Sequence, residues 1–185
     1  MDKVIGILAG SLRKASFSKK IAEAIIEFAP EGYEFKMVSL EDLPIYNQDF
    51  DDYNDVPQAI HLFRETMKGI SGVIFVTPEY NRSVPGVLKN AIDVGSRPYN
   101  KSIWDKKPAA VFSNSPGHLS GFGANHHLRQ SLVFLNMPTM QQPEVYLAQI
   151  KNDIDENGHL KEGDTKAFLK KAVAAYISWF EKNAV

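Results

Sequence analysis

Short runs of β-branched and apolar residues alternate along this chain with longer segments in which apolar residues recur at helical spacing. No other feature restricts the possible folds as strongly, because this alternation predicts βαβ units with a parallel sheet covered by helices on both faces. The runs expected to be strands are 3–9, 34–39, 72–77, 108–113 and a fifth near 144–147. The helices expected between and after them are 18–28, 56–68, 84–93, 121–135 and 165–180.

These elements predict an α/β fold of one domain over residues 1–185, a doubly wound sheet of five parallel strands in the order 2-1-3-4-5. A chain of this length can bury its own core without disulfide bonds or structural metals. In such sheets ligands bind beyond the carboxyl ends of the strands, where the strand order reverses. The loops after the first, third and fourth strands are therefore the candidate site loops.

The charge balance and the amino-acid usage exclude several classes of function. Basic residues number 21 and acidic residues 22, so no overall field favours nucleic acid or a membrane surface. No run of 18 apolar residues occurs, so no membrane-inserted segment is expected. The absence of cysteine excludes thiolate nucleophiles and thiolate metal sites and fits a reducing compartment, so we expect a cytoplasmic protein.

Polar clusters outside the three loops are expected to be solvated rather than functional. The histidines have no ligand partners at metal spacing, so no metal site is expected. The pairs Lys19-Lys20 and Lys106-Lys107 are expected at the solvated surface, where either could help to attract an NADPH phosphate. A solvated acidic loop near the ligand mouth is expected at Asp49, Asp51, Asp52 and Asp55.

The loop 10–18 joins the first strand to the first helix, where unpaired N–H groups and the positive end of the helix dipole favour an anion. Ser11, Ser16 and Ser18 can donate hydroxyl hydrogen bonds to a phosphate, and Arg13 can add a bidentate charged contact. Ser18 is expected to cap the helix. The alternative is a polar loop whose serines only cap the helix.

The type of phosphate follows from what the loop lacks. An ATP-binding P-loop would need glycine, lysine and serine or threonine where Ala15, Ser16 and Phe17 stand. A Rossmann NAD loop would need a second glycine, and residues 11–15 contain none, although Glu41 or Asp42 could imitate its ribose-binding acid. A hydroxyl-rich loop with one arginine fits a terminal monophosphate, such as that of FMN.

The segment 78–86 follows the third strand and is bounded by Pro78 and Pro85, which hold its backbone stiff. Tyr80 could lie along a flat heterocycle and Asn81 could bond its polar rim, while backbone N–H groups could reach the flavin N5 and O4. Ser83 is expected to cap the next helix. The alternative is a turn whose Tyr80 packs on the core.

The loop 113–117 follows the fourth strand and could complete a flavin site with small side chains and backbone amides. It also resembles the G-x-S-x-G turn of serine hydrolases, with Ser115 as nucleophile. The first glycine of that turn is absent, and Pro116 has no N–H to donate to an oxyanion, so a hydrolase is disfavoured.

Three motifs resemble the NADPH-dependent FMN reductase family, which includes bacterial quinone, chromate and azo reductases of flavodoxin-like fold. They are G-S-L-R-K-A-S-F-S from Gly10, P-E-Y-N-x-S-V-P-G-V-L-K-N-A-I-D from Pro78, and H-L-R-Q from His127. Arg82 and the Val94-Gly95 pair depart from residues common in that family. The resemblance implies that Ser11, Arg13, Ser16, Phe17 and Ser18 hold the FMN phosphate and that 78–81 hold the isoalloxazine.

The expected function is therefore an FMN-dependent oxidoreductase that uses NADPH or NADH as co-substrate and a quinone, azo, flavin or metal-oxyanion acceptor. No catalytic side chain is expected, because nicotinamide donates its hydride directly to flavin. The alternatives are a flavodoxin-like electron carrier without a nicotinamide site and a Rossmann dehydrogenase. The resemblance also implies a homodimer or homotetramer. The candidate cofactor-binding residues are Ser11, Arg13, Ser16, Phe17, Ser18, Pro78, Glu79, Tyr80, Asn81, Ser113, Ser115 and Gly117.

Overall fold

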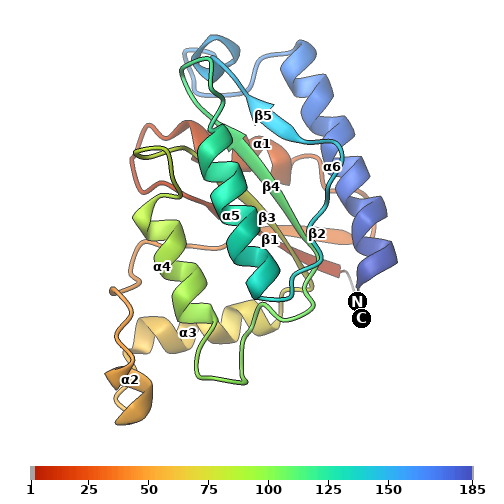
Figure 1. The fold of residues 1–185 in the computed structure, drawn as a ribbon. Helices are drawn as coiled ribbons and strands as arrows, with labels where there is room; N and C mark the ends of the chain where they lie inside the picture. Colours follow the sequence, from red (N-terminus) through yellow and green to blue (C-terminus); the bar gives the residue numbers. More distant parts are fainter. Residues whose placement is uncertain (1–2, 185) are drawn as a thin grey trace.

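A computed structural model describes residues 3–184 and contains a five-stranded parallel sheet in the order β2-β1-β3-β4-β5 (Figure 1). The predicted fold class and strand order are thereby confirmed. The strands are β1 Lys3–Ala9, β2 Tyr33–Met37, β3 Gly72–Thr77, β4 Ala109–Asn114 and β5 Val145–Leu147.

Helices cover both faces of this sheet, as the alternating pattern predicts. The helices are α1 Phe17–Ile26, α2 Asp49–Asp52, α3 Gln58–Lys68, α4 Gly86–Gly95, α5 Phe122–Phe134, the 3₁₀ turn η1 Ile150–Asp153 and α6 Asp164–Asn183. One face carries α1 and α6, and the other carries α3, α4 and α5. The five predicted helices are present, whereas α2 and η1 were not predicted.

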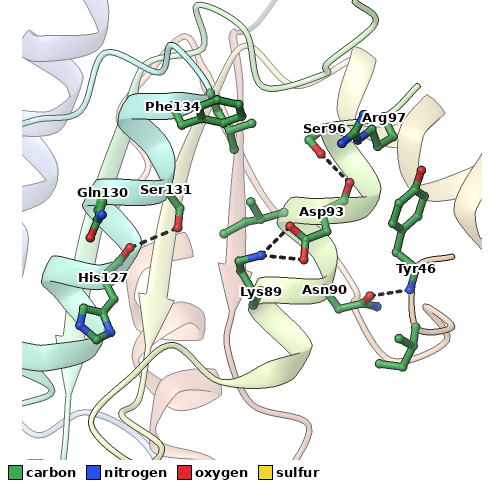
Figure 2. A pocket seen from close by; sticks show the side chains of 13 residues that line it. Tyr46, Lys89, Asn90, Asp93, Ser96, Arg97, His127, Gln130, Ser131 and Phe134 are labelled. Atoms are coloured by element: carbon green, nitrogen blue, oxygen red, sulfur yellow. Dashed lines mark hydrogen bonds and ion pairs between the residues drawn. The ribbon is translucent and has the colours of Figure 1, made fainter. Parts of the chain in front are cut away.

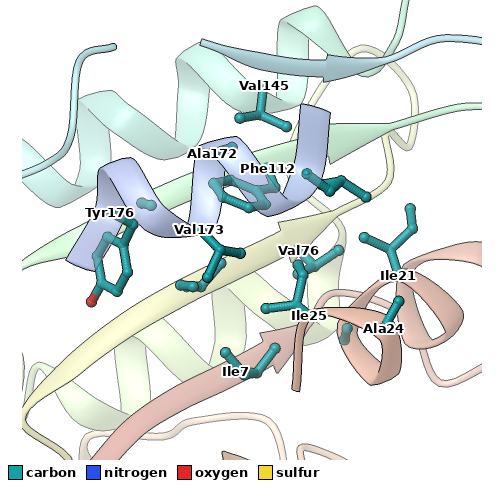
Figure 3. Packing of buried hydrophobic residues seen from close by; sticks show 14 of the residues in the cluster. Ile7, Ile21, Ala24, Ile25, Val76, Phe112, Val145, Ala172, Val173 and Tyr176 are labelled. Carbon is teal, nitrogen blue, oxygen red and sulfur yellow. The ribbon is translucent and has the colours of Figure 1, made fainter. Parts of the chain in front are cut away.

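Each central strand supplies side chains to two separate hydrophobic cores, because successive residues of a strand point to opposite faces. Val76 of β3 packs under α1 and α6 (Figure 3), and Ile74 belongs to the same core. Val73 and Phe75 pack under the other three helices. Burial on both faces explains why the strands read as continuous apolar runs rather than as alternating ones.

A glycine at the start of β3 lets α6 approach the sheet. A Cβ atom at Gly72 would lie 2.5 Å from the Tyr176 hydroxyl and 2.8 Å from the Phe180 ring. Both aromatic side chains are buried, and the Tyr176 hydroxyl donates to the Pro108 carbonyl at 3.0 Å. This position therefore has no room for a side chain.

The cap of α1 is Ser16, not Ser18, and the prediction of Ser18 as cap is wrong. The Ser16 hydroxyl accepts the Lys19 N–H at 3.3 Å, as expected three residues into a helix. Ser18 lies inside the first turn, buried against the end of β4. The sequence offers both serines at plausible positions, and only packing against the sheet selects one.

The acidic segment is a single helical turn rather than a solvated loop, and the prediction is wrong for Asp51. Its carboxylate accepts two hydrogen bonds from the Arg64 guanidinium, at 2.8 and 3.0 Å, and a third from the Tyr46 hydroxyl at 2.9 Å. The Arg64 guanidinium lowers the pKa of Asp51. Asp52, next in sequence, is exposed as expected.

Lys107 was expected at the solvated surface but is half-buried, whereas Lys106 is exposed. The Lys107 ammonium donates to the Met67 carbonyl at the end of α3, and burial lowers its pKa to about 8. The sequence shows two adjacent lysines, and only the position of α3 makes them unequal.

Candidate functional site

The loops after β1, β3 and β4 meet at the carboxyl edge of the sheet, and the side chain of Asn114 joins them. Asn114 ends β4, and its amide donates to the Ser18 hydroxyl at 2.9 Å and to the Thr77 carbonyl at 3.3 Å. One buried amide thus connects the start of α1 with the ends of β3 and β4. The predicted convergence of the loops is confirmed, but Asn114 was missed as a site residue. A polar residue that ends an apolar strand was its only signal.

The loop 11–18 presents three serine hydroxyls, all buried, whose hydrogens are free to donate. Each hydroxyl of Ser11, Ser16 and Ser18 accepts one hydrogen bond from an N–H group. Because the partners are donors, each hydroxyl keeps its own hydrogen, and in residues 3–184 none of the three donates it to a protein atom. The N–H groups are those of the Arg13 backbone, the Lys19 backbone and the Asn114 side chain, at 3.4, 3.3 and 2.9 Å.

The start of α1 adds backbone donors and one cation to these hydroxyls. The N–H groups of Phe17 and Ser18 lie in the first helical turn and have no partner within the helix. Arg13 is exposed, and its guanidinium donates to the Ala15 carbonyl at 2.8 Å and lies 5.8 Å from the centre of the Phe17 ring. The loop 10–18, referred to below as the anion loop, therefore combines free hydroxyl and backbone donors with one cation, and donors of these kinds suit an anion with several acceptor oxygens.

The segment after β3 forms a tight two-residue turn at Asn81 and Arg82. Both residues have positive φ, 50° and 65°, and the backbones of Tyr80 and Ser83 exchange two hydrogen bonds of 3.1 and 3.0 Å. Tyr80 is 49% exposed, so the alternative in which it packs on the core is wrong. About half of the Tyr80 side chain is thus accessible to a ligand.

Ser83 does not cap α4, and that prediction is wrong. The helix begins at Gly86 after Pro85, with no side-chain cap. The Ser83 hydroxyl instead lies 3.0 Å from Nδ1 of His127 on α5. His127 and its neighbour His126 point to different partners, since His126 Nε2 lies 3.0 Å from the Tyr146 hydroxyl.

Two of the candidate residues between β3 and α4, Pro78 and Glu79, have side chains that contact other segments of this chain. Pro78 is half-buried directly beside the anion loop, and a Cβ atom on Gly10 would lie 3.2 Å from its ring. The Glu79 carboxylate accepts the backbone N–H of Gly123 at 2.7 Å and that of Ala124 at 3.2 Å. Glu79 therefore faces the start of α5.

The three candidate residues at the end of β4 and in the loop after it lie in different environments. Ser113 is fully buried within the sheet, where its hydroxyl donates to the Val145 carbonyl at 3.3 Å and accepts from the Asn125 amide at 3.2 Å. Its side chain therefore stays inside the protein. Ser115 and Gly117 lie at the surface in a local turn, in which the Ser115 hydroxyl donates to the Gly117 carbonyl at 2.9 Å. These two residues remain accessible at the carboxyl edge of the sheet.

A large cavity of about 740 Å³ lies between α4 and α5 and was not predicted (Figure 2). One wall is α4, on which the Lys89 ammonium lies 2.6 Å from the Asp93 carboxylate. The other wall is α5, whose His127 contacts Ser83 in the turn after β3. Phe134, at the rim, is 87% exposed. The remaining lining residues include Tyr46, Asn90, Ser96, Arg97, Gln130 and Ser131.

No helix within residues 3–184 is long and apolar enough to cross a membrane. In the same residues, no group of three or more histidine, aspartate or glutamate side chains could hold a metal ion.

Comparison with known proteins agrees with this geometry. Residues 3–152 match the sequence model of the family described as NADPH-dependent FMN reductase. A quinone reductase of Pseudomonas putida is 50% identical over 179 residues, which are 97% of this chain and 95% of that protein. A 2-hydroxy-1,4-benzoquinone reductase of Burkholderia sp is 39% identical over 181 residues, 98% of each chain. The solved structure of FerB, a flavoenzyme NAD(P)H:(acceptor) oxidoreductase from Paracoccus denitrificans, superposes with a TM-score of 0.91 at 34% identity, covering 99% of this chain and 100% of that one.

Proposed function

This chain belongs to the NADPH-dependent FMN reductase family, and from that membership we propose that it is an FMN-dependent NAD(P)H oxidoreductase acting on small-molecule acceptors. When bound, FMN would supply the redox chemistry, accepting a hydride from NAD(P)H and returning two electrons to a quinone, azo, flavin or metal-oxyanion acceptor. Relatives named quinone reductase favour a quinone. This chain's own residues would bind FMN and orient the two substrates relative to it.

The observation that carries the proposal is the set of free donors in the loop 11–18. The hydroxyls of Ser11, Ser16 and Ser18 and the N–H groups of Phe17 and Ser18 together offer more donors than a carboxylate needs. Arg13 can add a bidentate charged contact by exchanging its bond to the Ala15 carbonyl. We assign the FMN phosphate to this loop.

The isoalloxazine ring is assigned to the turn after β3. Tyr80 offers an exposed aromatic face, and the N–H groups of Tyr80 and Ser83 are already used within the turn. Backbone N–H contacts to the flavin edge would therefore come from Asn81 and Arg82 at the tip of the turn, because the N–H groups of Ser115 and Gly117 are bonded within the protein and Pro116 has none. These residues would hold nicotinamide and acceptor in turn over one ring face, and orientation of this kind is a large contribution to rate.

The test begins with the purified protein, which should be yellow and should oxidise NADPH in the presence of a quinone. Arg13→Ala removes a charge-assisted contact worth about 1.5 to 3 kcal/mol, so the Kd for FMN should rise at least about tenfold. Lys14→Ala, which removes the next exposed cation, is the matched control and should change little. Colourless protein that ignores added FMN would end the proposal. FMN binding without steady-state NADPH oxidation would indicate an electron carrier instead.

We further propose that residues 1–185 act as one domain in the cytoplasm and as a homodimer or homotetramer. The support for association is two exposed apolar side chains near the end of α5: Phe134, at the rim of the cavity, is 87% exposed, and Val133, next in sequence, is 74% exposed. Exposed apolar side chains beside a large cavity are typical of a surface that another protein covers. A second copy of this chain is the proposed partner.

A further inference from the structure

The turn 79–83, assigned above to the flavin ring, is fixed to the start of α5 by a buried carboxylate. Oε2 of Glu79 accepts the N–H of Gly123 at 2.7 Å and that of Ala124 at 3.2 Å. Oε1 of the same carboxylate accepts from the Arg82 guanidinium at 3.2 Å. The Glu79 side chain is only 10% exposed, so these partners, and not water, satisfy it.

Helix α5 has no cap of its own, which explains why a residue 44 positions away takes that role. Its N-cap residue is Gly121, which has no side chain and lies in the left-handed region at φ 75°. The first N–H groups of a helix need an acceptor from elsewhere, and a negative charge is favourable at that end. Glu79 meets both requirements, so the carboxylate belongs to the helix start.

Two more contacts hold the same turn against α5. A Cβ atom at Gly123 would lie 2.7 Å from the Arg82 carbonyl and 3.0 Å from Oε2 of Glu79, so only glycine permits this approach. One turn further along the helix, Nδ1 of His127 lies 3.0 Å from the Ser83 hydroxyl. The residues between these contacts, Tyr80 and Asn81, are therefore held in one position relative to α5.

We propose that Glu79 is a positioning residue, which holds Tyr80 and Asn81 in place for the flavin ring and makes no contact with the cofactor itself. The inference rests on the proposed function, since the ring site is part of it. A carboxylate with three partners has little capacity left for a ligand. The same contacts explain why Glu79 lies in the ring segment and yet points to the start of α5.

The experiment compares FMN with riboflavin, which has the same ring and no phosphate. Glu79→Ala loosens only the ring site, so the Kd should rise about tenfold for both flavins. Arg13→Ala acts on the phosphate site, so the Kd should rise for FMN and stay unchanged for riboflavin. Glu79→Gln keeps an acceptor oxygen for α5 and should stay within about threefold of the wild type. Glu65→Ala, which removes an exposed glutamate from the surface of α3, is the control and should change neither Kd.

Two readouts separate positioning from a general loss of stability. The visible circular dichroism of bound FMN reports the ring environment and should change in Glu79→Ala but not in Glu65→Ala. Amide exchange in the flavin-free protein should become faster at 80–83 and at 123–124 in Glu79→Ala. A smaller increase at the same amides is expected in Glu79→Gln, which keeps an acceptor oxygen but loses the charge, and this variant allows the measurement if the alanine variant does not fold.

Three results would overturn the inference. A lower Tm with both Kd values and the circular dichroism unchanged would show that Glu79 only stabilises the fold. A loss of FMN affinity with riboflavin affinity intact would place Glu79 at the phosphate. Wild-type protein that binds neither flavin would remove the proposed function and the ring site with it, and the wild-type measurement alone distinguishes that case.

Discussion

Replacing Asp51 with asparagine removes one charge from an ion pair that joins α2 to α3. The side chains of Asp51 and Arg64 are only 8% and 10% exposed, and the two hydrogen bonds between them are 2.8 and 3.0 Å long. Nε of Arg64 also donates to the Val94 carbonyl at 3.1 Å, at the end of α4. The substitution would leave a buried guanidinium without its counter-charge.

The magnitude follows from that burial. Removal of one partner from a buried pair costs about 3 to 5 kcal/mol, because the remaining charge stays desolvated. Asparagine keeps one acceptor oxygen, so we expect the lower limit, about 3 kcal/mol. For a chain of this size about 1 kcal/mol lowers Tm by roughly 2 to 4 °C, so the expected loss is about 6 to 12 °C.

The pH dependence has a definite sign. The Arg64 guanidinium lowers the pKa of Asp51 below its unfolded value of about 3.9. A lowered pKa stabilises the folded state fully above the unfolded pKa, and this contribution is lost as pH falls through the folded pKa. The difference in unfolding free energy between wild type and Asp51→Asn should therefore be constant from about pH 5 to 7 and shrink below about pH 4.

Urea unfolding at a series of pH values measures this difference directly. Asp52→Asn is the matched control, because it makes the same chemical change on the same helical turn at an exposed position. Its effect should stay within about 0.5 kcal/mol. Two results would contradict this reasoning: equal unfolding free energies of Asp51→Asn and Asp52→Asn at pH 7, or a difference between wild type and Asp51→Asn that grows as the pH falls. Either would mean that the ion pair of Asp51 and Arg64 does not stabilise the fold as estimated.

Three other substitutions test separate parts of the structure. Ser18→Ala removes one phosphate donor and should weaken FMN binding about fivefold while riboflavin binding is unchanged, as titration of flavin fluorescence would show. Gly95→Ala would place a Cβ atom 2.5 Å from the Trp104 indole nitrogen, so the free energy of unfolding should fall by about 1 to 3 kcal/mol. Tryptophan fluorescence should also change, and an unchanged Tm would contradict this prediction. Phe134→Glu should shift the molar mass from light scattering towards a monomer, and a variant of unchanged mass rules out this face as the interface.

The fold and the anion loop could be predicted because their determinants are local in the chain. The apolar runs and helical spacing predict the strands and helices to within a few residues, and parallel pairing then brings the loops 10–18, 78–86 and 113–117 to one edge. The serines and Arg13 lie in a loop that starts a helix, and this position alone indicates an anion. No long-range contact was needed for these predictions.

Other features depend on pairs of residues that are far apart in sequence, and these could not be predicted. The carboxylate of Glu79 caps a helix 44 residues later, and Asn114 joins the start of α1 to two strands. The cavity between α4 and α5 is lined by side chains from segments that are far apart in the sequence. Hydropathy and spacing describe how one element buries its own face, but not which polar group of another element meets it. The sequence therefore determined the elements, their order and the anion loop, and the tertiary structure decided which side chains remain free for a ligand and which are used to hold the site together.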